Sequence, residues 1–368
     1  MFTLKHFINI ASSSLIGLIS LIFVYKYSLI YFNHPLLFAF GYALLFLFVI
    51  FSFDKIKTIP KRKDYNKYFL EAIILFILLI LYYVFFTKKA SSSFELLAIK
   101  NWLDNFYSLT FPYQLKNTFT AFPFLYFLAS PFYWIGNIAL LEILAWGTLS
   151  FLLIFNSISI REKVIKLFFL LVSPLTFYGL FESPVYFLLS IILIVLIYFS
   201  NKYINPSKVD KYFIWFAVIF GLFFAVRIEV IVVLIIYFLY LFRNNLKEGF
   251  LFCEILLAVF IVTIVPFILW NPKMYFFNGP FNSFFIIGIP WLEIIFYLLV
   301  AIYIGWIISD LQEIFFVIGI LSIIPEIISF IFTSNTSISN FIFCIPFLIL
   351  SIKDYRVEKF KGKILESF

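Results

Sequence analysis

The sequence is poor in charge. Asp, Glu, Lys and Arg supply 12% of its 368 residues, against about 25% in ordinary soluble domains. Hydrophobic residues supply 64%, which is more apolar surface than a soluble core could bury. This excludes an ordinary soluble globular domain, so lipid must surround much of the chain. Glycine and proline number only 12 and 14, which excludes a collagen-like chain and argues against a disordered one.

Cysteine and histidine are scarce. Cys253 and Cys344 both lie inside apolar runs, so the sequence does not support a disulfide framework. His6 and His34 are isolated, and no Cys/His cluster has the spacing of metal ligands. We therefore expect no zinc or haem site and assign no metal-binding residue.

What the sequence has in abundance is long apolar runs, which contain many of its 56 phenylalanines. A helix needs about 20 mostly apolar residues to cross a bilayer. The sequence thus predicts an all-α, polytopic membrane helix bundle with about 12 crossings. The predicted crossings are residues 7–31, 35–53, 69–86, 137–159, 167–181, 185–200, 212–226, 228–242, 250–270, 289–308, 314–332 and 338–352. The short pairs on either side of Pro184 and of Arg227 could instead be helical hairpins, re-entrant segments or broken helices that line a cavity.

Positive charge is concentrated on one side of this predicted topology. Of the 27 Lys and Arg residues, 20 fall in segments that alternate crossings place on the side of the amino terminus. Lys and Arg favour the cytoplasmic side, so both termini are expected in the cytoplasm of a multi-pass plasma membrane protein. The net charge of +8 is then a topology signal, and we expect no nucleic-acid partner.

The predicted outer side carries acids and one long segment without a clear crossing. The acids on this side are Glu95, Asp104, Glu142, Glu182, Glu229, Glu293 and Glu326, and together they suggest a polar cavity that opens outward. Residues 87–136 form a long outer loop. Its aromatic side chains suit the headgroup layer, so we expect interfacial helices lying on the outer leaflet. The expected anchors are Trp102, Phe106, Tyr107, Phe111 and Tyr113.

Three polar or proline-containing stretches occur in order along residues 69–245. In the first, Glu95 follows the third apolar run, and Pro112–Tyr113 and then Phe122–Pro123–Phe124 come after it. The second is SPLTFYGLFESPVYFLLS, with Glu182 at its break, and the third is GLFFAVRIEVIVVLIIYFLYLFRN, with Arg227 near its start. In this order the stretches resemble the GT-C superfamily of membrane glycosyltransferases, particularly the polyprenyl-phosphate-mannose-dependent mannosyltransferases.

The resemblance implies a domain organisation within one polytopic membrane domain, residues 1–368. Residues 1–68 would add two extra N-terminal helices to a GT-C-like module in 69–245 with its outer loop at 87–136. C-terminal helices in 246–352 and a basic cytoplasmic tail in 353–368 would follow. The implied activity is transfer of a sugar, mannose by resemblance, from a polyprenyl-phosphate donor to a glycan, lipid or protein acceptor at the outer face.

The residue types suit that chemistry. Sugar transfer to a hydroxyl needs a carboxylate to take the proton and a cation to stabilise the leaving phosphate. Glu95 is the first candidate base and Asp104 the second; nine residues apart on one helix, they need not share a face. Arg227 is the candidate phosphate ligand because its planar fork matches phosphate oxygens. An ion pair with Glu229 or Glu182 would explain Arg227 equally well.

The resemblance and the outer loop supply further candidates for donor binding. Glu182 and Tyr113 fall in the matching stretches, and Lys116 and Lys273 are alternative phosphate contacts or plain solvated loop residues. Tyr113 and Trp102 could stack on sugar or lipid, or anchor the membrane interface. A divalent metal ion could lie between the outer acids, although no spacing requires one.

Two other functions fit the same topology. A lipid-linked-sugar flippase or transporter would also have about 12 helices with both ends inside. A non-catalytic membrane scaffold subunit would explain the absence of paired acids in the outer loop.

Overall fold

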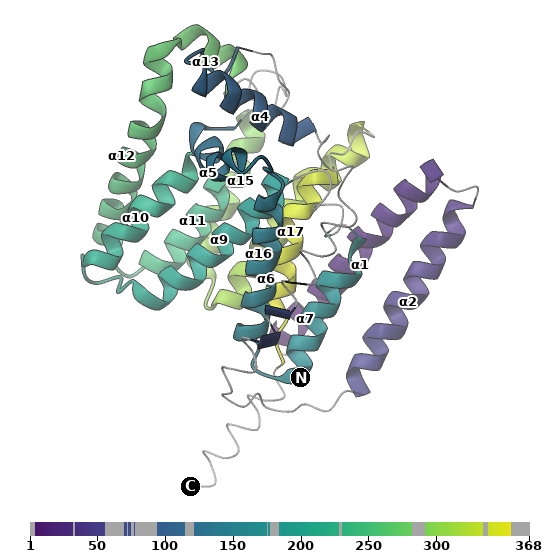
Figure 1. Ribbon diagram of the computed structural model, residues 1–368. Coiled ribbons are helices and arrows are strands. Elements are labelled where there is room, and N and C mark those ends of the chain that lie inside the picture. Colours follow the sequence, from purple (N-terminus) through teal and green to yellow (C-terminus); the bar gives the residue numbers. More distant parts are fainter. Residues whose placement is uncertain are drawn as a thin grey trace. The chain divides into compact units, whose positions relative to one another are not determined.

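The computed structural model describes residues 4–31, 34–55, 70, 71, 73, 74, 77, 94–114, 121–174, 176, 184–227, 230–281, 291–333 and 338–354. Within these residues it has 14 helices and no strand, so the all-helical prediction is confirmed (Figure 1). The chain divides into two compact units of helices.

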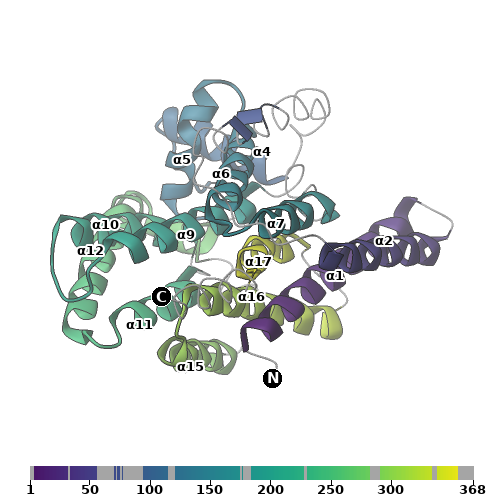
Figure 2. The same cartoon turned by 90° about the horizontal axis from the view of Figure 1, so that it is seen from below.

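The first unit comprises Met1–Ala90, Glu142–Ile191 and Asp310–Phe368. In it α1 packs beside α2 and beside α17, and α17 also packs beside α16 and α7, as both views show for the α1–α2 and α16–α17 pairs (Figures 1 and 2). Its helices are α1 (Leu4–Tyr31), α2 (Pro35–Lys55), α6 (Leu140–Asn156), α7 (Ile160–Val172), α16 (Leu311–Thr333) and α17 (Ile338–Ser351).

The second unit comprises Ser91–Leu141 and Ile192–Ser309. Helix α10 packs closely on α12, α11 on α15, and α4 on α5. Its helices are α4 (Phe94–Tyr107), α5 (Pro123–Trp134), α10 (Lys211–Phe224), α11 (Val230–Phe242), α12 (Leu246–Trp270), α13 (Pro272–Asn278) and α15 (Trp291–Ile307). Helix α9 (Pro184–Tyr203) begins in the first unit and continues into the second.

The predicted apolar runs coincide with helices wherever the structure describes them, although the helix ends shift by several residues. Most of the run at 69–86 lies outside the described residues. By length and composition, four of the described helices could cross a membrane: Leu4–Leu29, Pro35–Ser52, Tyr186–Tyr203 and Leu246–Trp270. The other apolar stretches whose side chains are described, such as Leu311–Ile324 within α16, have 10–17 residues. The structure therefore supports a helical membrane protein without fixing the number of crossings.

Proline marks the starts of several helices. Pro35, Pro123, Pro184 and Pro272 are each the first residue of a helix. Proline is favoured there because its ring presets the helical φ and its missing N–H would have no partner within the helix. This explains why the helices begin abruptly after the polar or aromatic breaks seen in the sequence.

Helix α7 corrects one predicted boundary. We expected residues 160–166 to be a loop, but α7 begins at Ile160. The Ser159 side chain accepts a hydrogen bond from the Glu162 N–H at 3.0 Å, which caps the helix start. Glu162 in turn accepts from the N–H of Ile158 at 3.4 Å, close to a capping box. A strong start signal therefore extends the helix beyond the apolar run.

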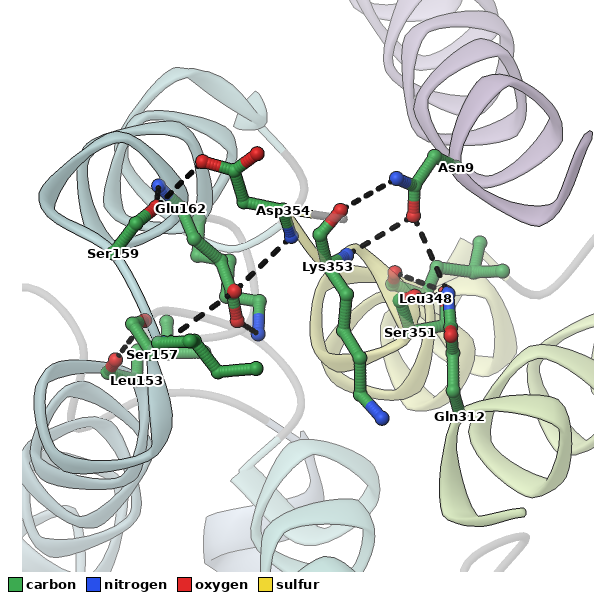
Figure 3. A network of polar contacts seen from close by, with 12 residues as sticks. Asn9, Leu153, Ser157, Ser159, Glu162, Gln312, Leu348, Ser351, Lys353 and Asp354 are labelled. Carbon is green, nitrogen blue, oxygen red and sulfur yellow. Dashed lines mark hydrogen bonds and ion pairs between the residues drawn. The ribbon is translucent and has the colours of Figure 1, made fainter. Parts of the chain in front are cut away.

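A buried polar network joins helix ends within the first unit (Figure 3). The Asn9 amide donates to the Lys353 carbonyl at 2.6 Å and accepts from the Lys353 N–H at 3.0 Å. Gln312 donates to the Ser351 carbonyl at 2.6 Å. The network ties the start of α1 to the end of α17 and the start of α16.

A second part of this network surrounds Asp354, whose carboxylate accepts from the Ser159 hydroxyl at 2.7 Å. The Asp354 N–H donates to Glu162 at 3.1 Å. Glu162 also pairs with Lys166 at 2.5 Å, and both side chains are almost fully buried. These contacts join the start of α7 to the residues that follow α17.

These hydrogen bonds join helix ends that the predicted topology places on the same side of the membrane. The starts of α1, α7 and α16 and the end of α17 were all predicted on one side, and they meet in this network. In the second unit, Arg243 after α11 donates to the carbonyl of Ile308 after α15 at 2.8 Å. Within each unit, the helix ends that these hydrogen bonds join are therefore ones that the predicted topology places together.

Candidate functional site

The two candidate bases lie on opposite sides of one helix. Glu95 is in the first turn of α4 and Asp104 is near its end. Nine residues are two and a half turns, so the two side chains point about 180° apart and their positions differ by about 14 Å along the axis. Glu95 is half-buried, with its Oε2 atom inaccessible to solvent, whereas Asp104 is exposed. The structure does not bring the two carboxylates together.

Three of the aromatic residues expected in the headgroup layer lie instead inside the second unit, whereas Tyr107, expected there as well, is exposed. Trp102, Phe111 and Tyr113 are only 3%, 5% and 4% exposed. The Trp102 ring stacks on Tyr126, with centroids 4.2 Å apart, and lies near-parallel to Phe106 at 5.3 Å. The expectation that these side chains anchor the interface or stack on a ligand is therefore wrong for Trp102. Its aromatic face packs against protein because α4 folds onto α5.

Tyr113 holds the chain that leads into α5. Its hydroxyl donates to the carbonyl of Ala121 at 2.8 Å, and the N–H of Ala121 donates to the Tyr126 hydroxyl at 3.3 Å. Burial raises the pKa of the Tyr113 phenol, and the nearby Tyr126 and Tyr275 phenols raise it further, so Tyr113 stays a proton donor at neutral pH. Two buried tyrosines thus bind both backbone polar groups of Ala121.

The same segment is bonded to the residues immediately before Arg227. The Phe122 N–H donates to the Val226 carbonyl at 3.0 Å, and the Phe124 N–H donates to the Ala225 carbonyl at 3.2 Å. The first and third sequence stretches, more than 100 residues apart in the chain, therefore meet in one place. We call this arrangement, which consists of Tyr113, Ala121–Phe124, Tyr126 and Ala225–Arg227, the tyrosine clamp.

Arg227 lies at the junction of α10 and α11 and is half-buried, with its Nη1 atom inaccessible to solvent. Burial raises the pKa of the Tyr126 phenol, while the Ala121 N–H and the positive charge of Arg227 act in the opposite direction. The guanidinium therefore lies within electrostatic range of the Tyr126 hydroxyl. This junction supplies the one candidate cation that the clamp contains.

Lys273 lies on the short helix α13 and is exposed. The helix start is capped by Asn271, whose side chain accepts from the Met274 N–H at 3.1 Å. Two residues after Lys273, Tyr275 packs edge-on against Tyr113, with centroids 5.5 Å apart. The Asn278 side chain also reaches the Gln114 carbonyl, at 3.5 Å. Helix α13 therefore packs beside the clamp and presents Lys273 to solvent.

Some predicted site residues lie outside the described residues. These are Lys116, Glu182 and Glu229, while Glu293 and Glu326 lie in helices whose side chains are not described there. The two ion pairs suggested for Arg227 therefore stay predictions, as does the outer acidic cavity. Among the described residues, no group of three His, Cys, Asp or Glu side chains could hold a metal ion.

Three tyrosines were missed by the sequence reasoning. Tyr126 and Tyr275 contribute to the clamp and its packing, and Tyr133 donates its hydroxyl proton to Asp104 across α4 and α5. Tyr126 and Tyr133 lie in a stretch of aromatic and apolar residues that only Ser130 interrupts. No spacing or polar neighbour distinguishes them there, so only the fold reveals their hydrogen bonds.

Comparison of the chain with models of protein families, with curated proteins and with solved structures gave no match in any of the three.

Proposed function

We propose that the protein is a membrane glycosyltransferase that moves a sugar from a polyprenyl-phosphate donor to an acceptor hydroxyl at the outer face of the plasma membrane. The observation that carries the proposal is the tyrosine clamp. It joins the loop that bears the candidate bases to the junction that bears Arg227, through backbone hydrogen bonds of 3.0 and 3.2 Å. A carboxylate and a cation from distant parts of the sequence thus belong to one compact unit.

The proposed reaction is a single displacement with inversion at the sugar. The acceptor hydroxyl oxygen attacks the anomeric carbon, and the bond from that carbon to the phosphate oxygen breaks. The hydroxyl proton passes to one carboxylate, and the leaving phosphate keeps the bonding electron pair. One base suffices, which agrees with the opposite orientations of Glu95 and Asp104 on α4. Arg227 is the residue we assign to the phosphate charge.

The proposal includes the finer topology. We infer about 12 crossings, several of them shorter than the usual span of about 20 residues, with both termini in the cytoplasm and residues 87–136 on the outer side. The uneven distribution of Lys and Arg supports the orientation. The same-side hydrogen bonds within each unit support the alternation.

The test uses the purified protein in lipid nanodiscs with polyprenyl-phosphate mannose that carries a radiolabelled sugar. A delipidated cell-envelope fraction serves as acceptor. We expect label to leave the donor and Arg227→Ala to lower the rate at least about 100-fold, as expected when a charge-stabilising group is lost. Arg227→Lys should recover only part of the rate because it keeps the charge but loses the planar fork.

The matched control is Lys247→Ala, which removes an exposed cation after α11 and should leave transfer unchanged. Glu95→Ala and Asp104→Ala are tested singly, and at least one should abolish transfer. Full transfer by both variants would refute the assignment of the base. Movement of intact donor across a liposome membrane without loss of its sugar would instead favour a flippase.

A further inference from the structure

A cluster of three aromatic rings, two exposed and one half-buried, lies beside Asp104 where α4 and α5 end. The Tyr107 ring stacks on Tyr133, with centroids 5.7 Å apart and planes 21° apart. It also contacts Trp134 at 5.8 Å and 41°. Trp134 is 70% exposed and Tyr107 is 41% exposed. We call Asp104, Tyr107, Tyr133 and Trp134 the aromatic surface.

The Asp104 carboxylate is held within this surface. Its Oδ1 atom accepts the hydroxyl proton of Tyr133, and this hydrogen bond is the main cause that raises the pKa of the Tyr133 phenol. Among the described residues, no hydrogen bond to Asp104 Oδ2 is present. An oriented carboxylate with one oxygen open to solvent can accept a hydrogen bond from a ligand hydroxyl.

The chemistry of the surface selects among ligands. Exposed rings provide flat apolar faces, and Tyr and Trp combine such faces with polar groups at interfaces. A carboxylate repels phosphates and other anions, so an anionic ligand is disfavoured. A sugar presents C–H groups on one face and hydroxyl donors at its edge, which match a ring and a carboxylate side by side.

We propose that the aromatic surface binds a carbohydrate chain, with sugar rings packed on Trp134 and Tyr107 and a hydroxyl donating to Asp104. The role of that chain as the acceptor rests on the proposed function, whereas the binding itself does not. A glycan acceptor is thereby selected over a lipid or protein acceptor. The surface would hold the chain beside the loop that carries the candidate bases.

Two exposed apolar side chains lie next to the surface in the sequence and suggest a competing explanation, which is that the surface contacts the membrane. Leu109 is 83% exposed and Ile135 is 68% exposed, and such residues also suit a membrane interface. The exposed Asp104 opposes only burial of the surface in the hydrocarbon core, because a charge at the bilayer centre costs about 2.5–3.5 kcal/mol; it is compatible with the headgroup layer. Lipid contact at Trp134 is therefore an outcome of the test that would overturn the proposal.

The test measures binding separately from catalysis. Protein in nanodiscs is titrated with mannohexaose, and binding is followed by saturation-transfer NMR. Because the contacts are few, we expect a Kd of about 1 mM, so the titration extends to about 10 mM. Trp134→Ala should weaken binding at least fivefold. Trp215→Ala is the matched control, since Trp215 is 65% exposed in the same unit and should not change binding.

Tyr107→Ser provides a second variant in case Trp134→Ala fails to fold, which gel filtration reports. Wild-type protein that transfers sugar but binds no mannohexaose, or Trp134→Ala protein that binds it normally, would overturn the inference. So would quenching of Trp134 by brominated lipid, measured as the difference between wild type and Trp134→Phe. Specific binding without any transfer would uphold the surface and count against the proposed function.

Discussion

The hydroxyl of Tyr113 donates a hydrogen bond of 2.8 Å to the carbonyl of Ala121 inside the second unit. The N–H of Ala121 donates to Tyr126, and the next residue, Phe122, donates to Val226. Tyr113 is therefore linked to the residue before Arg227 through its hydrogen bond to Ala121 and the hydrogen bond of the next residue, Phe122, to Val226. In the proposed reaction, Tyr113 would therefore position the Arg227 junction and would not contact the donor itself.

Replacing Tyr113 by Phe should lower the stability of the protein. The change removes one hydroxyl and leaves the buried Ala121 carbonyl without this donor, which costs about 1–3 kcal/mol. Thermal unfolding in detergent, followed by intrinsic fluorescence, measures the loss. Tyr303→Phe is the control, because Tyr303 is 69% exposed and should unfold at the wild-type temperature. Equal unfolding temperatures for the two variants would contradict the role of Tyr113.

The positions of the helices could be predicted because they follow from local sequence. An apolar run bounded by charge or proline can satisfy its backbone in lipid only as a helix. This accounts for α12, where the predicted run at 250–270 lies within Leu246–Trp270. The start of α7 was predicted too late, because Ser159 was assigned to the end of the preceding apolar run and its role as the cap of α7 was missed.

The contacts between helices could not be predicted in the same way. Trp102 lies on an amphipathic segment whose aromatic face could pack equally well on lipid or on another helix. Its burial against Tyr126 depends on where α5 lies. The Asn9 contact with Lys353 joins residues 344 positions apart, and no local pattern records it. Predicting such pairs requires the arrangement of the whole unit.

The buried pair of Glu162 and Lys166 yields a stability prediction. The two side chains are 1% and 3% exposed and their charged atoms are 2.5 Å apart. Lys166→Met should destabilise the protein by about 3–5 kcal/mol because it leaves a buried carboxylate without its cation. Adding Glu162→Gln should recover part of that loss, since the uncompensated charge is then gone.

An exposed ion pair in the same unit provides the comparison. Lys5 and Asp310 are 3.5 Å apart, with side chains 43% and 29% exposed, so Lys5→Met should cost no more than about 1 kcal/mol. Denaturant unfolding in mixed micelles measures all three variants. Similar losses in the free energy of unfolding for Lys166→Met and Lys5→Met would show that burial does not determine the contribution of the Glu162–Lys166 pair to stability.

Gly221 allows α10 to approach α12. A Cβ atom at this position would lie 2.6 Å from the Leu256 carbonyl oxygen and 2.8 Å from Val259 Cβ. Gly221→Ala should therefore cost about 1–3 kcal/mol through overpacking. At Gly41 nothing lies within 4 Å of an added Cβ, so Gly41→Ala should be neutral or stabilise α2 by up to about 1 kcal/mol. Thermal unfolding measures both variants. An unfolding temperature that is lower for Gly41→Ala than for Gly221→Ala would contradict this packing.

The topology can be tested with exposed lysines on either side of α12. Lys247 lies at its start and Lys273 follows its end, separated by a helix of 25 residues. In a background of Cys253→Ala and Cys344→Ala, Lys273→Cys should react with an impermeant maleimide in intact cells. Lys247→Cys should react only after the membrane is permeabilised. Labelling of both in intact cells would show that α12 does not cross the membrane. The reversed pattern would keep the crossing but move Glu95, Arg227 and the aromatic surface to the cytoplasmic side, where the proposed reaction would need a donor on the inner leaflet.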